Sequence, residues 1–586
     1  MWNFIKQILA VFIALGLFFT FSIFLIIGIG AASSSKNVTI IDNNSVLQIN
    51  LDKPLKEREE DNPLSELDLP FVNNNGGIGL IEIKKVIKSA KTDPKIKGIY
   101  LNVESIMGGS AAIEEIRNAL IDFKTSKKFI YSYSETYSEA AYYLASVSDK
   151  IFLNPSGILE FNGISSKSFF IKGMLDKLEL KPQIFRVGQY KSAVEPLILD
   201  KMSDANKEQT LSFISSINNH NLKQIAIARK TSFEKIKKIS DSMLVHNPVD
   251  AIKYGIATDL AYYDEFQDEL RAKLDIEENG KINFISYGKY KGSITDAENA
   301  STNKIAVIVA EGDIMSGKST EETIGSDDMA EEIRKARLDK NIKAIVLRIN
   351  SPGGSAMASD VMWREITLTA KSKPIIASMS DVAASGGYFM AMGCSKIVAQ
   401  PNSITGSIGV FGILFNISDF LKNKLGITVD GVKTGLFSDV GTTSREPTPF
   451  EKKVIQKEVD DIYKDFITKA AEGRKMSVDS LKKLASGRVW SGVEAKGNGL
   501  VDELGGLEKA ISIAAKNAKL GNDYKVEYFP ANKSFLEKIM TDLQSGMSVY
   551  QLKQNLGPYF NIYNQVNKLQ RMQGVQARLP FEIILQ

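Results

Sequence analysis

An internal repeat is the feature that most constrains how this chain can fold. The segment Asp93–Leu101 is similar to Asp339–Leu347. Further along, Ser132–Pro155 is similar to Ser378–Pro401. Both pairs have the same separation, because 339 minus 93 and 378 minus 132 each equal 246 residues. Two long similarities at one separation indicate a tandem duplication, so a fold with a single core is excluded for these 586 residues.

Within each copy, short runs rich in β-branched residues alternate with longer amphipathic segments. In the second copy, the runs Ala306–Ala310 and Ala344–Leu347 flank the helical pattern Asp328–Leu338. This alternation is typical of a parallel sheet covered by helices. The chain is therefore predicted to contain two α/β domains in tandem.

The amino-terminal region is almost wholly apolar. No charged side chain occurs between Gln7 and Ser35, and the run Ile8–Ala32 would extend roughly 37 Å as a helix, enough to span a bilayer. A cleaved signal peptide is the alternative, since Gly30-Ala-Ala32 could form a small-residue cleavage site. The length of the run favours a retained transmembrane anchor.

These observations divide the chain into four parts. We expect a transmembrane anchor in 1–36, a first repeat in 37–300, a second repeat in 301–530 and a carboxy-terminal appendage in 531–586. The appendage has no counterpart in the first copy, and its sequence does not indicate a role.

Composition excludes several function classes. The 73 Lys and Arg residues against 69 Asp and Glu leave a net charge of +4, too small for a dedicated nucleic-acid binder. The two histidines, His220 and His246, lie in polar contexts far from other candidate ligands, and Cys394 is the only cysteine. We therefore expect no metal site, no cofactor and no histidine-dependent triad.

A glycine-rich turn, Asn350–Ser355, follows one predicted strand and precedes a helix. The backbone N–H groups of Gly353 and Gly354 could point outward there, as in an anion or oxyanion site. Phosphate binding is a competing interpretation, but the spacing of known phosphate-binding loops is missing. A tight turn without chemistry is the third possibility.

A second turn, Asp381–Tyr388, contains a serine among small residues. Ser385 would expose its hydroxyl at the start of a helix, and Gly386 offers a further outward N–H. A serine hydroxyl needs a base within hydrogen-bond reach before it can act as a nucleophile. With the histidines poorly placed, that base must be a lysine or a carboxylate.

One lysine has a suitable setting. Lys191 follows a glycine turn and precedes small residues, and burial there would lower its pKa and leave it neutral. The second copy has Ser438 at the matching place, whereas the first copy has Glu139 where the second has Ser385. Each copy lacks what the other has, so the pair would have to meet across the interface between the copies.

The segments NSPGGS, AASGGY, TGSIGV and GQYKSAVEP together make the chain resemble the SppA-type signal peptide peptidases, also called protease IV, in their long duplicated form. The resemblance covers roughly residues 40–530 and the anchor. It implies a Clp protease-like or crotonase-like β-α superhelix in each copy, a homotetramer, and degradation of cleaved signal peptides. By position it implies Ser385 as nucleophile, Lys191 as general base, Ser407 as the serine that orients the lysine, and an oxyanion hole at Gly353, Gly354 and Gly386.

The resemblance also implies a location. It predicts a single-pass protein of the bacterial inner membrane, with the catalytic domains on the outer, periplasmic face and with peptides as substrates. Two alternatives remain open: an acyl-CoA enzyme of the crotonase class, which uses a similar oxyanion geometry, and a catalytically silent membrane scaffold.

Overall fold

The computed structural model describes residues 41–59, 77–294, 301–320, 322–531 and 574–579, together with residue 557 and parts of 2–21. Part of the predicted membrane segment, including all of 22–36, and most of the predicted appendage lie outside these ranges. Within the described part of the chain, no helix combines the length and the apolar character that crossing a membrane requires.

The first copy is built on a parallel six-stranded sheet, with strand order β8-β6-β5-β4-β1-β9. The strands are β1 (Ser45–Asn50), β4 (Ile96–Asn102), β5 (Phe129–Tyr137), β6 (Lys150–Leu159), β8 (Asp259–Leu260) and β9 (Asn283–Ser286). Its helices are α2 (Leu80–Thr92), α3 (Ser110–Lys124), α4 (Glu139–Ala145), α8 (Phe233–Asp241), α9 (Pro248–Tyr254), α10 (Tyr263–Leu274) and α11 (Tyr287–Ser293).

The second copy repeats this plan in a sheet with the order β19-β17-β15-β13-β10-β21, to which β16 and β20 are attached. Its strands are β10 (Lys304–Glu311), β13 (Ile342–Ser351), β15 (Ile375–Ala384), β16 (Lys396–Ala399), β17 (Ile404–Gly406), β19 (Val489–Ser491), β20 (Glu503–Leu504) and β21 (Lys525–Phe529). Its helices are α12 (Ser326–Leu338), α13 (Ala356–Ala370), α14 (Gly386–Ala391), η2 (Phe420–Lys424), α15 (Pro449–Arg474), α16 (Val478–Leu484), α17 (Gly492–Gly497) and α18 (Leu507–Asn517).

The two sheets also agree in register. Strand β5 pairs with β6 at Tyr137 and Leu159, and β15 pairs with β17 at Ala383 and Thr405. Each residue of the second pair lies 246 positions after its counterpart, since 383 minus 137 and 405 minus 159 give the same number. The predicted tandem duplication of an α/β domain is confirmed.

Buried parallel strands explain the apolar runs in the sequence. Strand β10 reads KIAVIVAE, and six of its eight residues are buried because helices cover the sheet. Separate apolar cores lie in the two copies, one around Ile87, Leu120 and Ile151 and one around Ile345 and Met379. Each copy thus has an apolar core of its own.

A third sheet joins the copies, with the order β12-β11-β14-β22-β18-β7. It contains β7 (Lys181–Val187), β11 (Asp313–Met315), β12 (Thr323–Gly325), β14 (Gly353–Ser355), β18 (Val410–Asn416) and β22 (Gly574–Arg578). Strand β7 leaves the first copy and pairs antiparallel with β18 along its whole length, from Val187 opposite Val410 to Lys181 opposite Asn416. The segment after β7 is thereby carried into the second copy.

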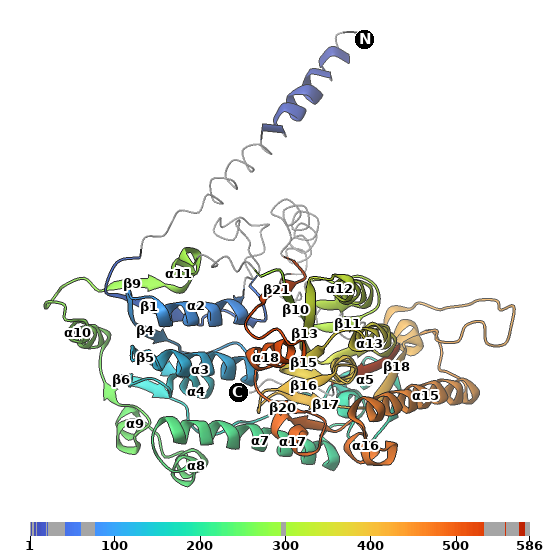
Figure 1. Cartoon of the computed structure of the whole chain (residues 1–586). Helices are drawn as coiled ribbons and strands as arrows, with labels where there is room; N and C mark the ends of the chain where they lie inside the picture. Colours follow the sequence, from blue (N-terminus) through green and yellow to red (C-terminus); the bar gives the residue numbers. More distant parts are fainter. Residues whose placement is uncertain are drawn as a thin grey trace.

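The arm that carries β7 begins with α5 (Lys172–Lys177) and continues through η1 (Ser192–Val194), α6 (Glu195–Ile198) and the long helix α7 (Asp204–Ala228). Figure 1 shows α7 along the lower part of the molecule, extending from the first copy to α17 of the second. Helix α7 contacts β19 of the second copy, where the hydroxyls of Ser216 and Ser491 lie 2.7 Å apart. A short pair of strands, β2 (Leu55–Lys56) and β3 (Ile78–Gly79), completes the described structure.

Candidate active site

Ser385 lies at a sharp turn between strand and helix. Strand β15 ends at Ala384 and α14 begins at Gly386, so Ser385 is the single residue between them. Its φ of 53° and ψ of −109° are strained for a residue with a side chain. Its N–H donates to the carbonyl oxygen of Gly406 at 2.8 Å, which holds the turn against β17. The strand-to-helix geometry expected for a nucleophile is therefore present.

Lys191 reaches this turn from the first copy. After β7, the chain turns at Gly188 with a φ of 98°, where a Cβ would collide with the backbone of Ser486. Lys191 follows this turn, and its Nζ lies 2.8 Å from the Oγ of Ser385 and 2.9 Å from the Oγ of Ser407. Its Nζ also donates to the carbonyl oxygen of Ser407 at 3.1 Å. The structure thus brings together all three side chains predicted for the catalytic group.

The electrostatics of Lys191 favour a neutral amine. The side chain is fully buried, and this burial lowers its pKa well below the usual value for lysine. No carboxylate forms an ion pair with it among the residues that the structure describes, so nothing there restores the charged form. The ring of Phe411 lies 6.0 Å from Nζ and contributes to the apolar surroundings. A neutral amine at 2.8 Å can accept the proton of Ser385.

The glycine turn forms strand β14, which lies beside the serine turn. Gly354 has a φ of 159°, and a Cβ there would overlap the backbone of Ile314. The backbone nitrogen of Gly386 lies 2.7 Å from the position that a Cβ of Gly353 would take. The N–H of Gly353 itself donates to the Oγ of Ser351 at 3.2 Å, so this group serves the turn. Gly354 and Gly386 therefore remain the better placed donors for an oxyanion.

Strand β22 was not anticipated, because the sequence indicates no role for residues 531–586. It runs antiparallel to β14, with Ala577 opposite Gly354, and antiparallel to β18, with Gln576 opposite Phe411. The carbonyl oxygen of Ala577 lies directly against Gly353, and it would be 3.1 Å from a Cβ of Gly386. A strand of the chain itself thus lies between β14 and β18, beside the oxyanion turn.

Arg578 and Leu579 anchor the far end of β22. The guanidinium of Arg578 forms an ion pair with Asp313 at 2.9 Å, and Leu579 packs with Ala384 and Val489. The N–H of Leu579 donates to the carbonyl oxygen of Pro352 at 2.6 Å. The only sequence signal for this segment is a short run of apolar residues near the end of the chain.

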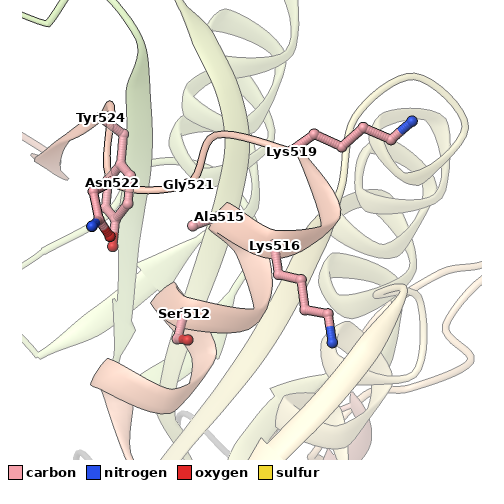
Figure 2. A pocket seen from close by; sticks show the side chains of 7 residues that line it. All are labelled: Ser512, Ala515, Lys516, Lys519, Gly521, Asn522 and Tyr524. Atoms are coloured by element: carbon pink, nitrogen blue, oxygen red, sulfur yellow. The ribbon is translucent and has the colours of Figure 1, made fainter.

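Other candidate groups are not part of this site. His220 lies 3.3 Å from a carboxylate oxygen of Glu114, in the first copy, and His246 is mostly exposed. No cluster of potential metal ligands occurs within the described ranges. Figure 2 shows an open pocket that contains none of the predicted site residues, lined by Ser512, Ala515, Lys516, Lys519, Gly521, Asn522 and Tyr524.

A strained serine beside a buried lysine with a lowered pKa and two glycine N–H groups is what a serine hydrolase with a lysine base requires. Comparison with known proteins agrees. The model of Peptidase family S49 matches residues 122–277 and 367–521, one match in each copy. The chain belongs to peptidase family S49, and it is a serine peptidase.

The similarity to individual relatives extends over most of the chain. Protease 4 of Haemophilus influenzae is 33% identical over 94% of this chain and 92% of its own length. The chloroplastic serine protease SPPA of Arabidopsis thaliana is 34% identical over 86% of this chain and 74% of its own. Protease 4 of Salmonella typhi is 36% identical over 79% of this chain and 76% of its own.

Among solved structures, a mutant of ClpP1 from Listeria monocytogenes is 16% identical and aligns with a TM-score of 0.24, covering 35% of this chain and 94% of that one. A similarity this weak decides nothing about the fold.

Proposed function

We propose that this chain is a membrane-anchored endopeptidase that degrades cleaved signal peptides, with Ser385 as nucleophile and Lys191 as general base. The observation that carries the proposal is the 2.8 Å approach of a fully buried lysine amine to the hydroxyl of a strained serine. A relative in Enterococcus faecium, 36% identical over 42% of this chain, is named a putative signal peptide peptidase SppA, which supports the substrate class.

In the proposed reaction, neutral Lys191 takes the proton of Ser385 while the serine oxygen bonds to a peptide carbonyl carbon. The carbonyl electrons move to the oxygen, which the N–H groups of Gly354 and Gly386 stabilise. Lys191 then gives its proton to the leaving amine as the C–N bond breaks. A water molecule repeats the sequence on the acyl-enzyme and returns the proton to Ser385. Ser407, 2.9 Å from Nζ, keeps the lysine aimed at the nucleophile.

Peptide substrates would bind as β22 does, as an extended strand between β14 and β18. Backbone pairing to two strands holds a peptide with little dependence on its sequence, which suits the degradation of varied signal peptides. In the register of β22, the carbonyl oxygen of Ala577, a residue with a small side chain, lies next to the oxyanion turn. The expected cleavage site therefore follows a small residue, and β22 must leave before a peptide can enter.

The location is proposed from the amino-terminal sequence. The apolar run Ile8–Ala32 would anchor the chain in the bacterial inner membrane, with both repeats on the periplasmic face, where released signal peptides remain in the bilayer. Labelling of an introduced surface cysteine by a membrane-impermeant maleimide in intact spheroplasts would test this topology. Protection of the cysteine until the membrane is opened would contradict it.

Assembly into a homotetramer is a further part of the proposal. Exposed apolar side chains follow one another along the segment between η2 and α15, where Val429, Val432 and Leu436 are all more than half exposed. An apolar surface of this kind favours contact with further copies of the chain. Light scattering on the detergent-solubilised protein would test it, and a mass equal to one chain would contradict it.

The decisive experiment is hydrolysis of an apolar fluorogenic peptide by the full-length chain, compared with Ser385→Ala and Lys191→Ala. We expect both substitutions to abolish cleavage while the proteins keep the wild-type circular dichroism spectrum. Activity that survives either substitution would contradict the assignment of the dyad. Failure of every version, wild type included, would favour the acyl-CoA enzyme or the silent scaffold.

A further inference from the structure

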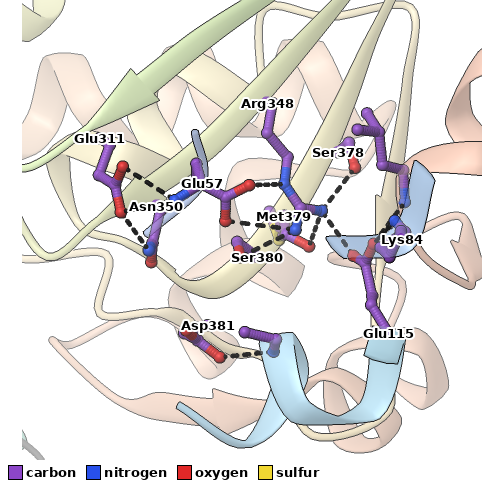
Figure 3. A network of polar contacts seen from close by, with 12 residues as sticks. Glu57, Lys84, Glu115, Glu311, Arg348, Asn350, Ser378, Met379, Ser380 and Asp381 are labelled. Carbon is purple, nitrogen blue, oxygen red and sulfur yellow. Dashed lines mark hydrogen bonds and ion pairs between the residues drawn. The ribbon is translucent and has the colours of Figure 1, made fainter. Parts of the chain in front are cut away.

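Asp381 connects the strand of the nucleophile to the first copy of the domain. It lies on β15, four residues before Ser385. Its Oδ1 accepts a hydrogen bond at 2.9 Å from the N–H of Ala112, which belongs to the first turn of α3 (Figure 3). The contact thus joins residues that are 269 positions apart in the chain.

The place where Asp381 binds is the counterpart of the oxyanion turn. Helix α3 begins at Ser110 and α13 at Ala356, which is 246 residues later, and both helices have 15 residues. The turn Gly108–Gly109 directly precedes α3, and the turn Gly353–Gly354 precedes α13 with Ser355 between them. The free N–H groups at the start of a helix favour an anion. In the first copy this position holds a carboxylate of the second copy.

The fit between the turn and Asp381 is close. A Cβ at Gly109 would overlap the carboxyl group of Asp381, although the φ of −81° at Gly109 is ordinary for any residue. Glycine is therefore required here by space and not by backbone conformation. The requirement comes from a side chain of the other copy.

Neighbouring contacts hold the same strand. Arg348, on β13, donates to the hydroxyls of Ser378 and Ser380 on β15 at 3.1 and 2.9 Å. The buried guanidinium of Arg348 also forms ion pairs with Glu57 at 2.7 Å and Glu115 at 2.8 Å, both from the first copy (Figure 3). Strand β15 is therefore fixed to the first copy along the stretch that leads to Ser385.

We infer that Asp381 is a positioning residue: the start of α3, at Gly109 and Ala112, holds its carboxylate and so fixes Ser385 relative to Lys191. The inference rests on the proposed function of the dyad. It assigns to the first copy a second contribution to the active site, besides the arm that carries Lys191.

The test places a methyl group in the first copy, at a position far from Ser385 in the sequence. Gly109→Ala would push Asp381 away, and because displacement by about 1 Å can cost about a hundredfold in rate, we expect kcat to fall about 10- to 100-fold with KM within twofold. Gly108→Ala is the matched control, because the three atoms nearest to its Cβ would all belong to the side chain of Leu55 and none to Asp381. We expect the control to keep kcat within twofold.

Further variants keep the test decisive if Gly109→Ala does not fold. Asp381→Asn retains an acceptor oxygen and should restore most of the rate lost in Asp381→Ala. The double variant Gly109→Ala/Asp381→Ala should be no slower than the slower single variant, because both changes act on one contact. A crystal structure of Asp381→Ala should show the Lys191 Nζ to Ser385 Oγ distance lengthened beyond hydrogen-bond range.

Two results would overturn the inference while leaving the dyad intact. One is a wild-type kcat in both Gly109→Ala and Asp381→Ala, when Ser385→Ala abolishes cleavage in the same assay. The other is an unchanged distance between Lys191 and Ser385 in the variant crystal structure. If the wild type itself does not cleave peptides, the proposed function fails first, and the crystal structure still tests the positioning role.

Discussion

The two copies differ most at the position of the nucleophile. Ser385 of the second copy corresponds to Glu139 of the first, 246 residues earlier, and each stands at the start of a short helix. The carboxylate of Glu139 accepts the N–H groups of Asn162 at 3.2 Å and Gly163 at 2.8 Å. In the first copy, the position of the nucleophile is therefore used to hold a loop.

A second difference between the copies lies at the position of Ser407. The register of β5 on β6 places Phe161 where the second copy has Ser407. Phe161 is buried and packs edge-on against Tyr142, with the ring centroids 5.3 Å apart. An aromatic ring thus stands at the position where the second copy has the hydroxyl that contacts Lys191. The same fold therefore carries the proposed catalytic side chains in the second copy and packed side chains at the matching positions of the first.

The glycine turns differ in what covers them. Leu55 and the carboxylate of Asp381 cover the turn of the first copy, both from segments that are built into the domains. Strand β22, from the end of the chain, covers the turn of the second copy. The first turn has become a structural contact, whereas the second can be uncovered by moving one strand.

We expect the largest change in kcat when the nucleophile is substituted. Ser385→Ala should lower kcat for peptide cleavage by at least about 10⁴-fold, because it removes the oxygen that forms the acyl-enzyme. Glu139→Gln, the matched change in the first copy, should leave kcat within threefold, since an amide oxygen can still accept the two N–H groups. Steady-state kinetics on both variants measures the contrast. A similar loss in both would show that the copies share the chemistry.

The pH dependence should be the next largest effect. Because Lys191 acts as a base only when neutral, kcat/KM should rise about tenfold per pH unit below its pKa and then level off. Burial lowers this pKa, so the plateau should begin well below pH 10.5, the usual value for lysine. A pH–rate profile with an ester substrate measures it. A rate that continues to rise up to the ordinary pKa of lysine would contradict a buried neutral amine.

Ser407→Ala should have a smaller effect. It removes one hydrogen bond to the lysine, at 2.9 Å, and should lower kcat about tenfold, which matches roughly 1.4 kcal/mol. Ser438→Ala provides the control, because Ser438 is exposed and donates only to the carbonyl oxygen of Gly435 in the described structure. Equal kcat values for Ser407→Ala and the wild type would remove Ser407 from the active site.

The smallest effect concerns the strand that covers the second turn. Arg578→Glu should loosen β22 by breaking its ion pair with Asp313, and kcat/KM should rise about fivefold, the equivalent of about 1 kcal/mol. The double variant Arg578→Glu/Asp313→Arg restores opposite charges and should return the rate toward the wild-type value. A lower rate in Arg578→Glu would indicate that β22 supports the active site.

Much of the architecture could be read from the sequence. The repeat predicted two α/β domains, because similar residues at a constant separation must form similar elements. Ser385, Lys191 and the glycines could also be named from local patterns, because they stand in turns of small residues beside predicted strands and helices, whereas Ser407 was named only through the family resemblance. The missing partner in each copy, Glu139 for Ser385 and Ser438 for Lys191, indicated that the copies must act together.

The remaining features depend on contacts between distant segments, which no local pattern encodes. Ser385 and Lys191 are 194 residues apart and meet because β7 pairs with β18, a pairing set by the packing of both copies. The same holds for β22 beside Gly354 and for Asp381 at the start of α3. The amino-acid sequence alone is enough to establish the duplication and to name the reactive side chains. The lowered pKa of Lys191 depends on the tertiary structure, because it comes from complete burial among residues of both copies.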